Sequence, residues 1–186
     1  ISLANLEKTN EGYALAKVFA FKTCELINKN KNFKYKTIVP CNIFGPKDNF
    51  DLKTGHMIPA AIKKIDFAMK NKKKFVEIWG SGKPRREFMY VQNLVDFIFI
   101  FIRKFNKMPD IINVGINKEF SIKKYYQLIG EKLNYKGKFI FNLNKPDGQM
   151  SKMIDSKYAR KFGWKPNISL EEGIKRTIIY YKKTKF

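Results

Sequence analysis

Tyr13 and Lys17 stand four residues apart in a run that has the pattern of a long helix. Residues at this spacing lie one turn apart on the same helical face, so the lysine ammonium can sit beside the phenol. A nearby cation favours the ionised form of a phenol. The pair has the chemistry to protonate a carbonyl oxygen during reduction and to be reprotonated afterwards, although the same spacing also occurs by chance on helix surfaces.

His56 is the only histidine, and it follows Gly55 directly before an expected helix. An imidazole can carry a proton to or from a carbon beside a ketone, but a lone histidine is more often a structural or surface group. Cys24 lies eleven residues after Tyr13, about 16 Å further along a helix that rises 1.5 Å per residue. Core packing therefore explains Cys24 better than catalysis, and Cys41 is expected to be a small residue at a strand end.

The elements that must position these residues alternate between helix and strand. Ala16, Phe19, Ala20, Cys24 and Ile27 recur at three- and four-residue steps, which predicts a helix over 13–28 with one buried face. A buried strand over 35–43 follows, and helix followed by buried strand is typical of a parallel α/β sheet. The remaining expected elements are a loop at 47–56, a helix at 58–71, a strand at 75–79 ended by the Gly80–Gly82 turn, an extended piece at 88–91, an apolar helix at 93–105, a strand at 111–114, a helix at 122–133 capped by Ser121, a strand at 139–142, a polar loop at 144–152 and a final helix opened by a capping box at 169–172.

Composition limits the partners. The chain has 186 residues, 44% of them hydrophobic, and a net charge of +22, which would attract phosphates. Only five of its 38 basic residues are arginine and no recognition motif is present, so the sequence argues against a nucleic-acid role and allows an anionic substrate. Two cysteines without metal-ligand spacing fit a reduced, cytoplasmic protein with no metal site. The longest nearly apolar stretch, 94–102, is too short to cross a bilayer, which needs about 20 residues.

Six segments together carry a resemblance over essentially the whole chain. They are Thr9–Lys17, Pro40–Phe50, Gly55–Ala60, Trp79–Phe88, Asn113–Gly115 and Lys145–Gly148. In combination they resemble the C-terminal two-thirds of an extended short-chain dehydrogenase/reductase, and within that superfamily the GDP-L-fucose synthase family. No glycine-rich turn of the family's kind lies in this sequence, so we expect that turn, the catalytic serine and the cysteine that partners the histidine to lie N-terminal to it.

The resemblance implies an α/β fold made of a Rossmann-type parallel-sheet remnant and a smaller mixed α/β substrate-binding domain. Residues 1–45 would belong to the NAD(P)-binding domain and 46–186 mainly to the substrate-binding domain, with 88–117 returning to the Rossmann sheet. We expect a C-terminal portion of a homodimeric enzyme that is inactive alone and binds NADPH weakly or not at all.

The resemblance also assigns roles, for the NADPH-dependent conversion of GDP-4-keto-6-deoxy-mannose to GDP-L-fucose. His56, with the absent cysteine, would exchange protons at the two carbons that flank the 4-keto group, and Tyr13 would protonate the new alkoxide. The choice between NADP(H) and NAD stays open, because the residue that reads the ribose lies upstream. The expected catalytic residues are Tyr13, Lys17 and His56; the expected cofactor contacts are Lys17, Pro40, Cys41, Asn42, Ile43 and His56; the expected contacts of the GDP-sugar are Lys64, Trp79, Arg86, Asp147 and Lys152.

Two alternatives remain. One is another nucleotide-sugar enzyme of the extended superfamily, such as a 4-epimerase, a 4,6-dehydratase or a heptose epimerase-reductase. The other is a basic binding fragment without catalytic activity. Upstream residues and substrate assays would distinguish the alternative enzymes from one another. A cofactor titration would distinguish a binding fragment from an active chain.

Overall fold

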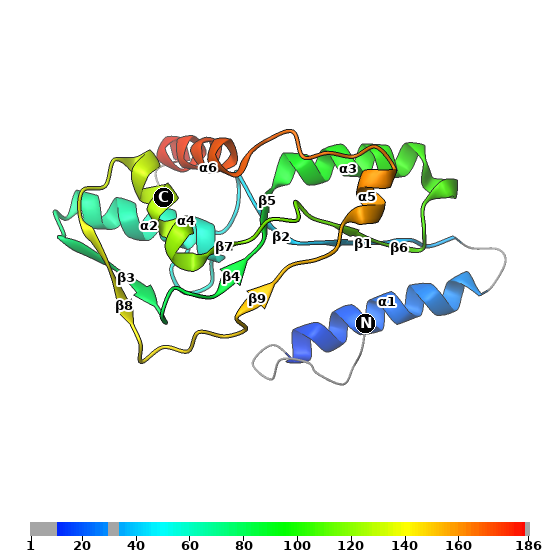
Figure 1. Cartoon of the computed structure of the whole chain (residues 1–186), viewed down its shortest axis with the longest axis horizontal. Helices are drawn as coiled ribbons and strands as arrows, with labels where there is room; N and C mark the ends of the chain where they lie inside the picture. Colours follow the sequence, from blue (N-terminus) through cyan, green and yellow to red (C-terminus); the bar gives the residue numbers. More distant parts are fainter. Residues whose placement is uncertain (1–10, 30–33, 185–186) are drawn as a thin grey trace.

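The computed structural model describes residues 11–29 and 34–184, in which helices and strands alternate along most of the chain (Figure 1). In chain order the elements are α1 (Glu11–Asn28), β1 (Thr37–Pro40), β2 (Asn42–Phe44), α2 (Met57–Lys70), β3 (Phe75–Trp79), β4 (Arg85–Arg86), β5 (Phe88–Tyr90), α3 (Val91–Arg103), the 3₁₀ turn η3 (Phe105–Lys107), β6 (Ile111–Val114), β7 (Phe120–Ser121), α4 (Ile122–Leu133), β8 (Lys138–Asn142), β9 (Ser151–Lys152), α5 (Lys157–Lys161) and α6 (Leu170–Thr184).

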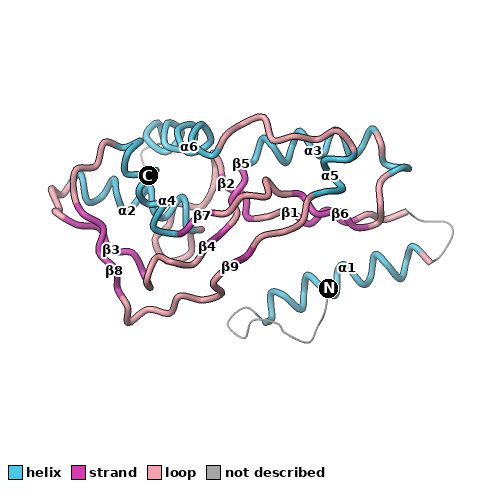
Figure 2. Tube along the Cα trace, viewed as in Figure 1, coloured by secondary structure: helices cyan, strands magenta, loops and turns pink. Residues whose placement is uncertain are grey.

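Parallel pairing dominates the strands, as the helix–strand alternation predicts. β1 pairs with β6, β2 with β5 and β3 with β8, and all three pairs are parallel. β4 lies between two partners, antiparallel to β7 and parallel to β9, so it joins three distant parts of the chain (Figure 2). The expected α/β class is therefore observed.

The strand expected over 35–43 is two strands that use different partners. β1 ends at Pro40, opposite Val114 of β6, and the amide of Cys41 donates the last bond of this ladder to the Val114 carbonyl at 3.0 Å. Proline has no amide hydrogen and interrupts a ladder. From Asn42 onward the chain pairs with β5 instead, and this change of partner places 40–43 between two strand pairs.

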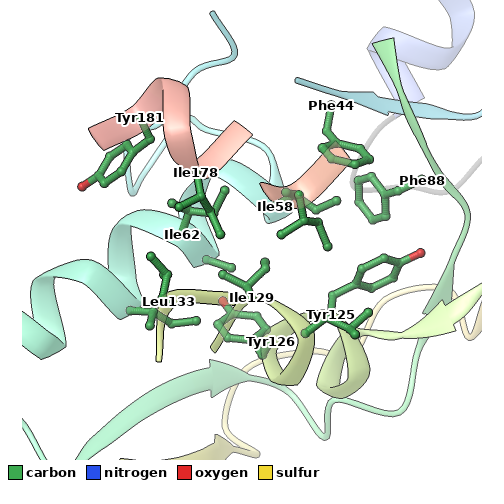
Figure 3. Packing of buried hydrophobic residues seen from close by; sticks show 14 of the residues in the cluster. Phe44, Ile58, Ile62, Phe88, Tyr125, Tyr126, Ile129, Leu133, Ile178 and Tyr181 are labelled. Atoms are coloured by element: carbon green, nitrogen blue, oxygen red, sulfur yellow. The ribbon is translucent and has the colours of Figure 1, made fainter. Parts of the chain in front are cut away.

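The larger hydrophobic cluster fills the space between α2, α4 and α6 (Figure 3). Ile58 and Ile62 of α2 meet Ile129 of α4 and Ile178 of α6, all of them at most 5% exposed. These positions recur at three- and four-residue steps, so each helix presents one apolar face to the others. The Ser121 hydroxyl accepts a bond from the Lys124 amide at 3.2 Å and caps α4 as predicted.

A second, smaller hydrophobic cluster packs α3 and α5 against β6. Phe97 and Trp164 are 0% and 1% exposed and meet edge to face, with ring centroids 5.9 Å apart. The buried amide of Asn93 bonds the main chain at Asn167 and Ile168, and Trp164 donates to the Asn93 carbonyl at 3.0 Å. This network holds the segment that leads into α6.

α1 stands apart from both clusters and runs along the other side of β1 and β6 from α3 in the view of Figure 1. Val18 is its only buried residue. The expected buried face is wrong at Ala16, Phe19 and Ala20, which are exposed, whereas Cys24 and Ile27 of the same face are partly buried. Val18 is buried and Phe21 is partly buried, although neither was expected. The helical period was right, but the period alone does not say which stripe is covered.

Candidate active site

The Tyr13 and Lys17 side chains meet on the surface of α1. The Lys17 ammonium lies 5.3 Å from the centre of the Tyr13 ring, and the Tyr13 residue is 67% exposed. Helical spacing alone produces this contact. In Figure 1 the end of α1 that carries Tyr13 points towards the part of the molecule that holds β4 and β9. The pair is therefore formed and open to solvent.

The segment from Gly45 to His56 is a loop braced by its own polar groups. Pro46 and Lys47 form a tight turn in which Lys47 adopts the left-handed φ of 65°, and the Asp48 amide faces the Gly45 carbonyl at 3.4 Å. Asp51 accepts bonds from the amides of Lys53 and Thr54, both at 2.9 Å. The loop therefore has a fixed shape at the point where it leads into α2.

Gly55 is required where this loop closes. A Cβ at this position would lie 2.4 Å from the carbonyl oxygens of both Asn49 and Asp51. Phe50, 2% exposed, anchors the same loop against Tyr181 of α6, with ring centroids 5.0 Å apart. His56 follows directly and is the N-cap residue of α2, as the sequence placed it before a helix.

His56 points one ring nitrogen at a carboxylate. Its Nδ1 lies 3.3 Å from Asp48 Oδ1, and the histidine side chain is 75% exposed whereas that of Asp48 is 14% exposed. The ring makes no hydrogen bond that caps α2. The imidazole is therefore held on one side and open on the other.

The strand-end segment from Pro40 to Ile43 is mostly committed to structure. The Asn42 side-chain amide donates to the Glu87 carbonyl at 2.9 Å and ties β2 to the start of β5. Burial raises the pKa of the Cys41 thiol to about 12, and the nearby Glu87 carboxylate adds to the shift. A raised thiol pKa disfavours the thiolate, which is the nucleophilic form of cysteine.

Glu87 is a fully buried carboxylate that the sequence-based site did not include. Its Oε1 accepts from the Asn117 amide at 2.7 Å, and its Oε2 accepts from the Ile154 amide at 3.1 Å. Buried charges persist in proteins when hydrogen bonds satisfy them. Glu87, between β4 and β5, thus joins this part of the chain to two later loops.

Trp79 lies exposed at the end of β3 between two ammonium groups. The Lys64 and Lys145 Nζ atoms lie 4.8 and 5.4 Å from the centre of the indole, which is within cation–π range. Burial lowers the pKa of Lys64. The structure thus brings together two expected substrate contacts, Lys64 and Trp79, and adds Lys145 to them.

Asp147 holds the tight turn after β3. Its carboxylate accepts two bonds from Ser81, one from the amide at 2.6 Å and one from the hydroxyl at 2.7 Å. These bonds keep the pKa of Asp147 below its usual range. Gly80, with a left-handed φ of 73°, leaves the space that this carboxylate fills, because a Cβ there would lie 2.3 Å from Asp147 Oδ1.

Arg86 and Lys152 are opposed across the β4–β9 pair. One guanidinium nitrogen of Arg86 already donates to the carbonyls of Arg85 and Gln149 at 2.7 and 2.6 Å. The Arg86 residue as a whole is half-buried. Main-chain carbonyls therefore orient the guanidinium through one of its nitrogens.

The expected site residues form groups rather than one cluster. Side-chain contacts join Tyr13 to Lys17 and Lys64 to Trp79, and strand pairing places Arg86 opposite Lys152. His56 and Asp147 have partners that were not predicted, Asp48 and Ser81. Asp48, Glu87 and Lys145 were missed as individual residues, although each lies inside a segment that carried the family resemblance. Membership of these segments was the signal that could have singled them out.

Two further features of the described residues bear on the site. No group of three or more histidine, cysteine, aspartate or glutamate side chains within 11–29 and 34–184 could hold a metal ion. In the same part of the chain, no helix combines the length and apolarity needed to cross a membrane.

The parallel strand pairs, with helices between them and polar residues where the strands end, define an α/β fold of the dinucleotide-binding kind. The model of the NAD dependent epimerase/dehydratase family matches residues 2–115. The chain therefore belongs to this family, and the expected extended short-chain dehydrogenase/reductase fold is confirmed.

Curated relatives match the chain over nearly its whole length. It is 48% identical to a GDP-L-colitose synthase of Yersinia pseudotuberculosis, covering all of this chain and 60% of the relative. It is 42% identical to a GDP-L-fucose synthase of Azorhizobium caulinodans, covering 94% of this chain and 56% of the relative. The chain thus spans little more than half the length of these proteins.

Solved structures of GDP-sugar enzymes also match nearly the whole chain. A GDP-6-OMe-4-keto-L-xylo-heptose reductase from C. jejuni superposes with a TM-score of 0.88 at 27% identity, covering 97% of this chain and 63% of that one. A GDP-L-fucose synthetase from Naegleria fowleri bound to NADP gives 0.82 at 27% identity, with coverages of 95% and 55%. The names of these relatives and solved structures all refer to GDP-sugars.

Proposed function

We propose that this chain is part of a GDP-sugar epimerase-reductase of the fucose synthase type that uses NADP(H). The single observation that carries the proposal is the high identity to two GDP-sugar synthases, 48% and 42%, over at least 94% of the chain. The Tyr13–Lys17 contact and the outward-facing His56 support it, because these are the proton-transfer groups that such a reaction requires.

The residues present fit the nicotinamide end of such a cofactor. Ligands of parallel α/β sheets bind beyond the carboxyl ends of the strands, where β1 passes into Pro40–Ile43. Cys41 and Ile43 are partly buried there and would offer small and apolar contacts to a ring. Lys17 would bind the ribose, and Pro40 to Ile43 with His56 would line the nicotinamide. When bound, the cofactor supplies hydride to a carbonyl carbon.

Each catalytic side chain then has one task. His56 would exchange a proton on one face of a carbon beside the keto group, and the cysteine expected upstream would exchange a proton on the other face. Both exchanges are possible because the enolate places its charge on oxygen. Tyr13 donates a proton to the oxygen of the reduced carbonyl, and the Lys17 ammonium stabilises the resulting phenolate. Epimerisation leaves the composition of the sugar unchanged, whereas reduction adds one hydride and one proton, and the Tyr13 phenolate then regains its proton from solvent.

The nucleotide part of the substrate would lie against Trp79, with the Lys64 and Lys145 ammonium groups available for its phosphates. Arg86 and Lys152 would add positive charge at the β4–β9 pair. Lys64 offers a point charge rather than a bidentate fork, so it would attract phosphate without fixing its orientation. Asp147 would contribute to nucleotide binding indirectly, because its bonds to Ser81 hold the turn that follows β3.

The proposal is tested by expressing the gene with any coding sequence that precedes Ile1 and following NADPH oxidation with the 4-keto GDP-sugar. We expect turnover that Tyr13→Phe reduces by about 1,000-fold, because the proton donor is lost. Unchanged turnover in that variant would refute the role of Tyr13. For the 186-residue chain alone we expect weak or no binding of NADPH, and tight binding would refute the expected need for an N-terminal part.

A second candidate is a reaction on a related GDP-sugar. The higher identity to the GDP-L-colitose synthase favours a deoxysugar other than fucose, and the TM-score of 0.88 favours a heptose. Competition among the corresponding keto sugars, read as relative kcat/KM, decides between them.

A further inference from the structure

Asp48 and His56 face each other across the loop that joins β2 to α2. The carboxylate oxygen Oδ1 lies 3.3 Å from Nδ1 of the ring, although eight residues separate the two along the chain. The carboxylate is mostly buried, and the ring is mostly exposed. A proton carrier is thus held at its inner nitrogen by a group that is withdrawn from solvent.

The carboxylate is fixed independently of the histidine. The same Oδ1 accepts a bond from the Asn49 amide at 2.8 Å, and Asp48 directly follows Lys47, which has a left-handed φ of 65°. The buried ring of Phe50, two residues later, anchors the loop in the large core. Asp48 therefore has a bond of its own within the loop, and its carboxylate can orient the ring of His56.

The other side of the imidazole has no structural duty that competes with this contact. The main chain of His56 begins α2, since its carbonyl accepts the Ala60 amide at 3.0 Å, and its side chain makes no capping bond. A neutral imidazole carries one N–H, and the bond made by one nitrogen decides which nitrogen keeps the lone pair. A carboxylate at Nδ1 leaves the lone pair on Nε2.

We propose that Asp48 is the positioning residue of His56. It accepts the Nδ1 proton, keeps the lone pair on the outward Nε2, and stabilises the imidazolium that forms when Nε2 takes a proton. In that step a C–H bond beside the keto group breaks, its electron pair moves to the carbonyl oxygen, and an N–H bond forms at Nε2. Asp48 stays ionised throughout. The substrate in this step rests on the proposed function, whereas the Asp48–His56 contact is a feature of the structure itself.

The chain offers a clean test, because His56 is its only histidine and ¹⁵N NMR of the imidazole reads one residue. For the neutral ring in the 186-residue chain we expect Nδ1 to be protonated and Nε2 to be bare. Asp48→Ala should move the ring towards the Nε2–H form that prevails in free histidine, and Asp48→Asn, which keeps an oxygen acceptor, should retain part of the original form. A wild-type ring in the Nε2–H form, or no change in Asp48→Ala, would overturn the proposal.

Asp51→Asn is the matched control, since Asp51 lies in the same loop but its carboxylate bonds main-chain amides rather than the ring. We expect it to leave the tautomer unchanged, and circular dichroism of every variant checks that the fold is intact. A tautomer shift of equal size in this control would assign the effect to loop shape and overturn the proposal.

A second readout separates this inference from the proposed function. In the protein expressed with any preceding coding sequence, Asp48→Asn should slow solvent deuterium exchange into the substrate by about 10- to 100-fold, with KM nearly unchanged. Normal exchange in this variant would overturn the role of Asp48. The expected tautomer together with no exchange in the unmodified protein would instead refute the proposed function and leave the Asp48–His56 assignment standing.

Discussion

α1 and the loop before α2 carry the two halves of the proposed chemistry, and they are built in opposite ways. α1 buries one residue, Val18, and presents Tyr13 on an open surface. The loop from Gly45 to His56 is cross-linked by its own hydrogen bonds and anchored by the buried ring of Phe50. The reducing pair depends on helix geometry alone, whereas the histidine depends on tertiary structure.

The difference has a practical meaning for stability and function. A substitution on α1 can alter chemistry with little effect on the fold, because few contacts of the described chain are lost. A substitution at Phe50 is expected to alter both, because this ring holds against α6 the loop that carries Asp48 and His56. The following variants are chosen to break or sharpen this contrast.

Phe50→Ala should have the largest effect. Removing this 2% exposed ring should lower the free energy of unfolding by about 3 to 5 kcal/mol, the usual cost of a large cavity. Phe19→Ala on α1, where the ring is 75% exposed, should change it by less than about 0.5 kcal/mol. Urea titration followed by circular dichroism measures both, and equal losses would show that α1 is covered in solution.

Gly55→Ala and Gly12→Ala should shift stability in opposite directions. At Gly55 the new methyl would clash with two carbonyl oxygens, which should cost about 1 to 3 kcal/mol. At Gly12, in the first turn of α1, nothing lies within 4 Å, so alanine should stabilise the helix by about 0.5 to 1 kcal/mol. Thermal melts give the signs directly, and stabilisation at Gly55 would contradict the described loop.

Lys64→Met and Lys145→Met should each weaken GDP binding to the 186-residue chain by about fivefold, near 1 kcal/mol. Each variant removes one ammonium beside Trp79 and keeps an apolar stem of similar length. Lys22→Met on α1 is the control, since Lys22 pairs with Glu25 there. Calorimetric titration should show loss in the first two variants only; an equal loss in the control would mean that GDP responds to net charge.

Tyr13→Phe should have the smallest effect on stability, below about 0.5 kcal/mol, because the 67% exposed side chain keeps its ring and loses only a hydroxyl. The same variant is expected to remove most reduction. Urea midpoints of the two proteins should coincide within error. A clear loss of stability would show that the hydroxyl has a structural partner and would weaken the contrast between the two regions.

Sequence alone predicted the longer elements well, because they follow local rules. α2, α4 and β3 lie within two residues of their expected bounds, since apolar periodicity and a capping serine define them. β4, β7 and β9 escaped prediction because two-residue strands exist only through pairing with distant segments. The capping box at 169–172 is half present: Ser169 accepts the Glu172 amide, but the Glu172 carboxylate bonds Arg176.

The site shows the same division. The Tyr13–Lys17 contact follows from helical spacing, and His56 was found because its segment resembles a known family. The Asp48–His56 contact joins residues eight positions apart across an irregular loop, and the Asp147–Ser81 bonds join residues 66 positions apart. Neither contact is encoded in a periodicity or a spacing, so tertiary structure was needed to find them.

The two tryptophans differ in exposure, so the fluorescence of the buried one can serve as an internal reference for that of the exposed one. Trp79 is 55% exposed and flanked by two ammonium groups, whereas Trp164 is 1% exposed. Iodide should therefore quench the emission of Trp79 efficiently, caesium should quench it poorly because like charges repel, and neither ion should reach Trp164. Any ligand that covers the indole of Trp79 would be seen as protection from iodide against an unchanging signal from the core.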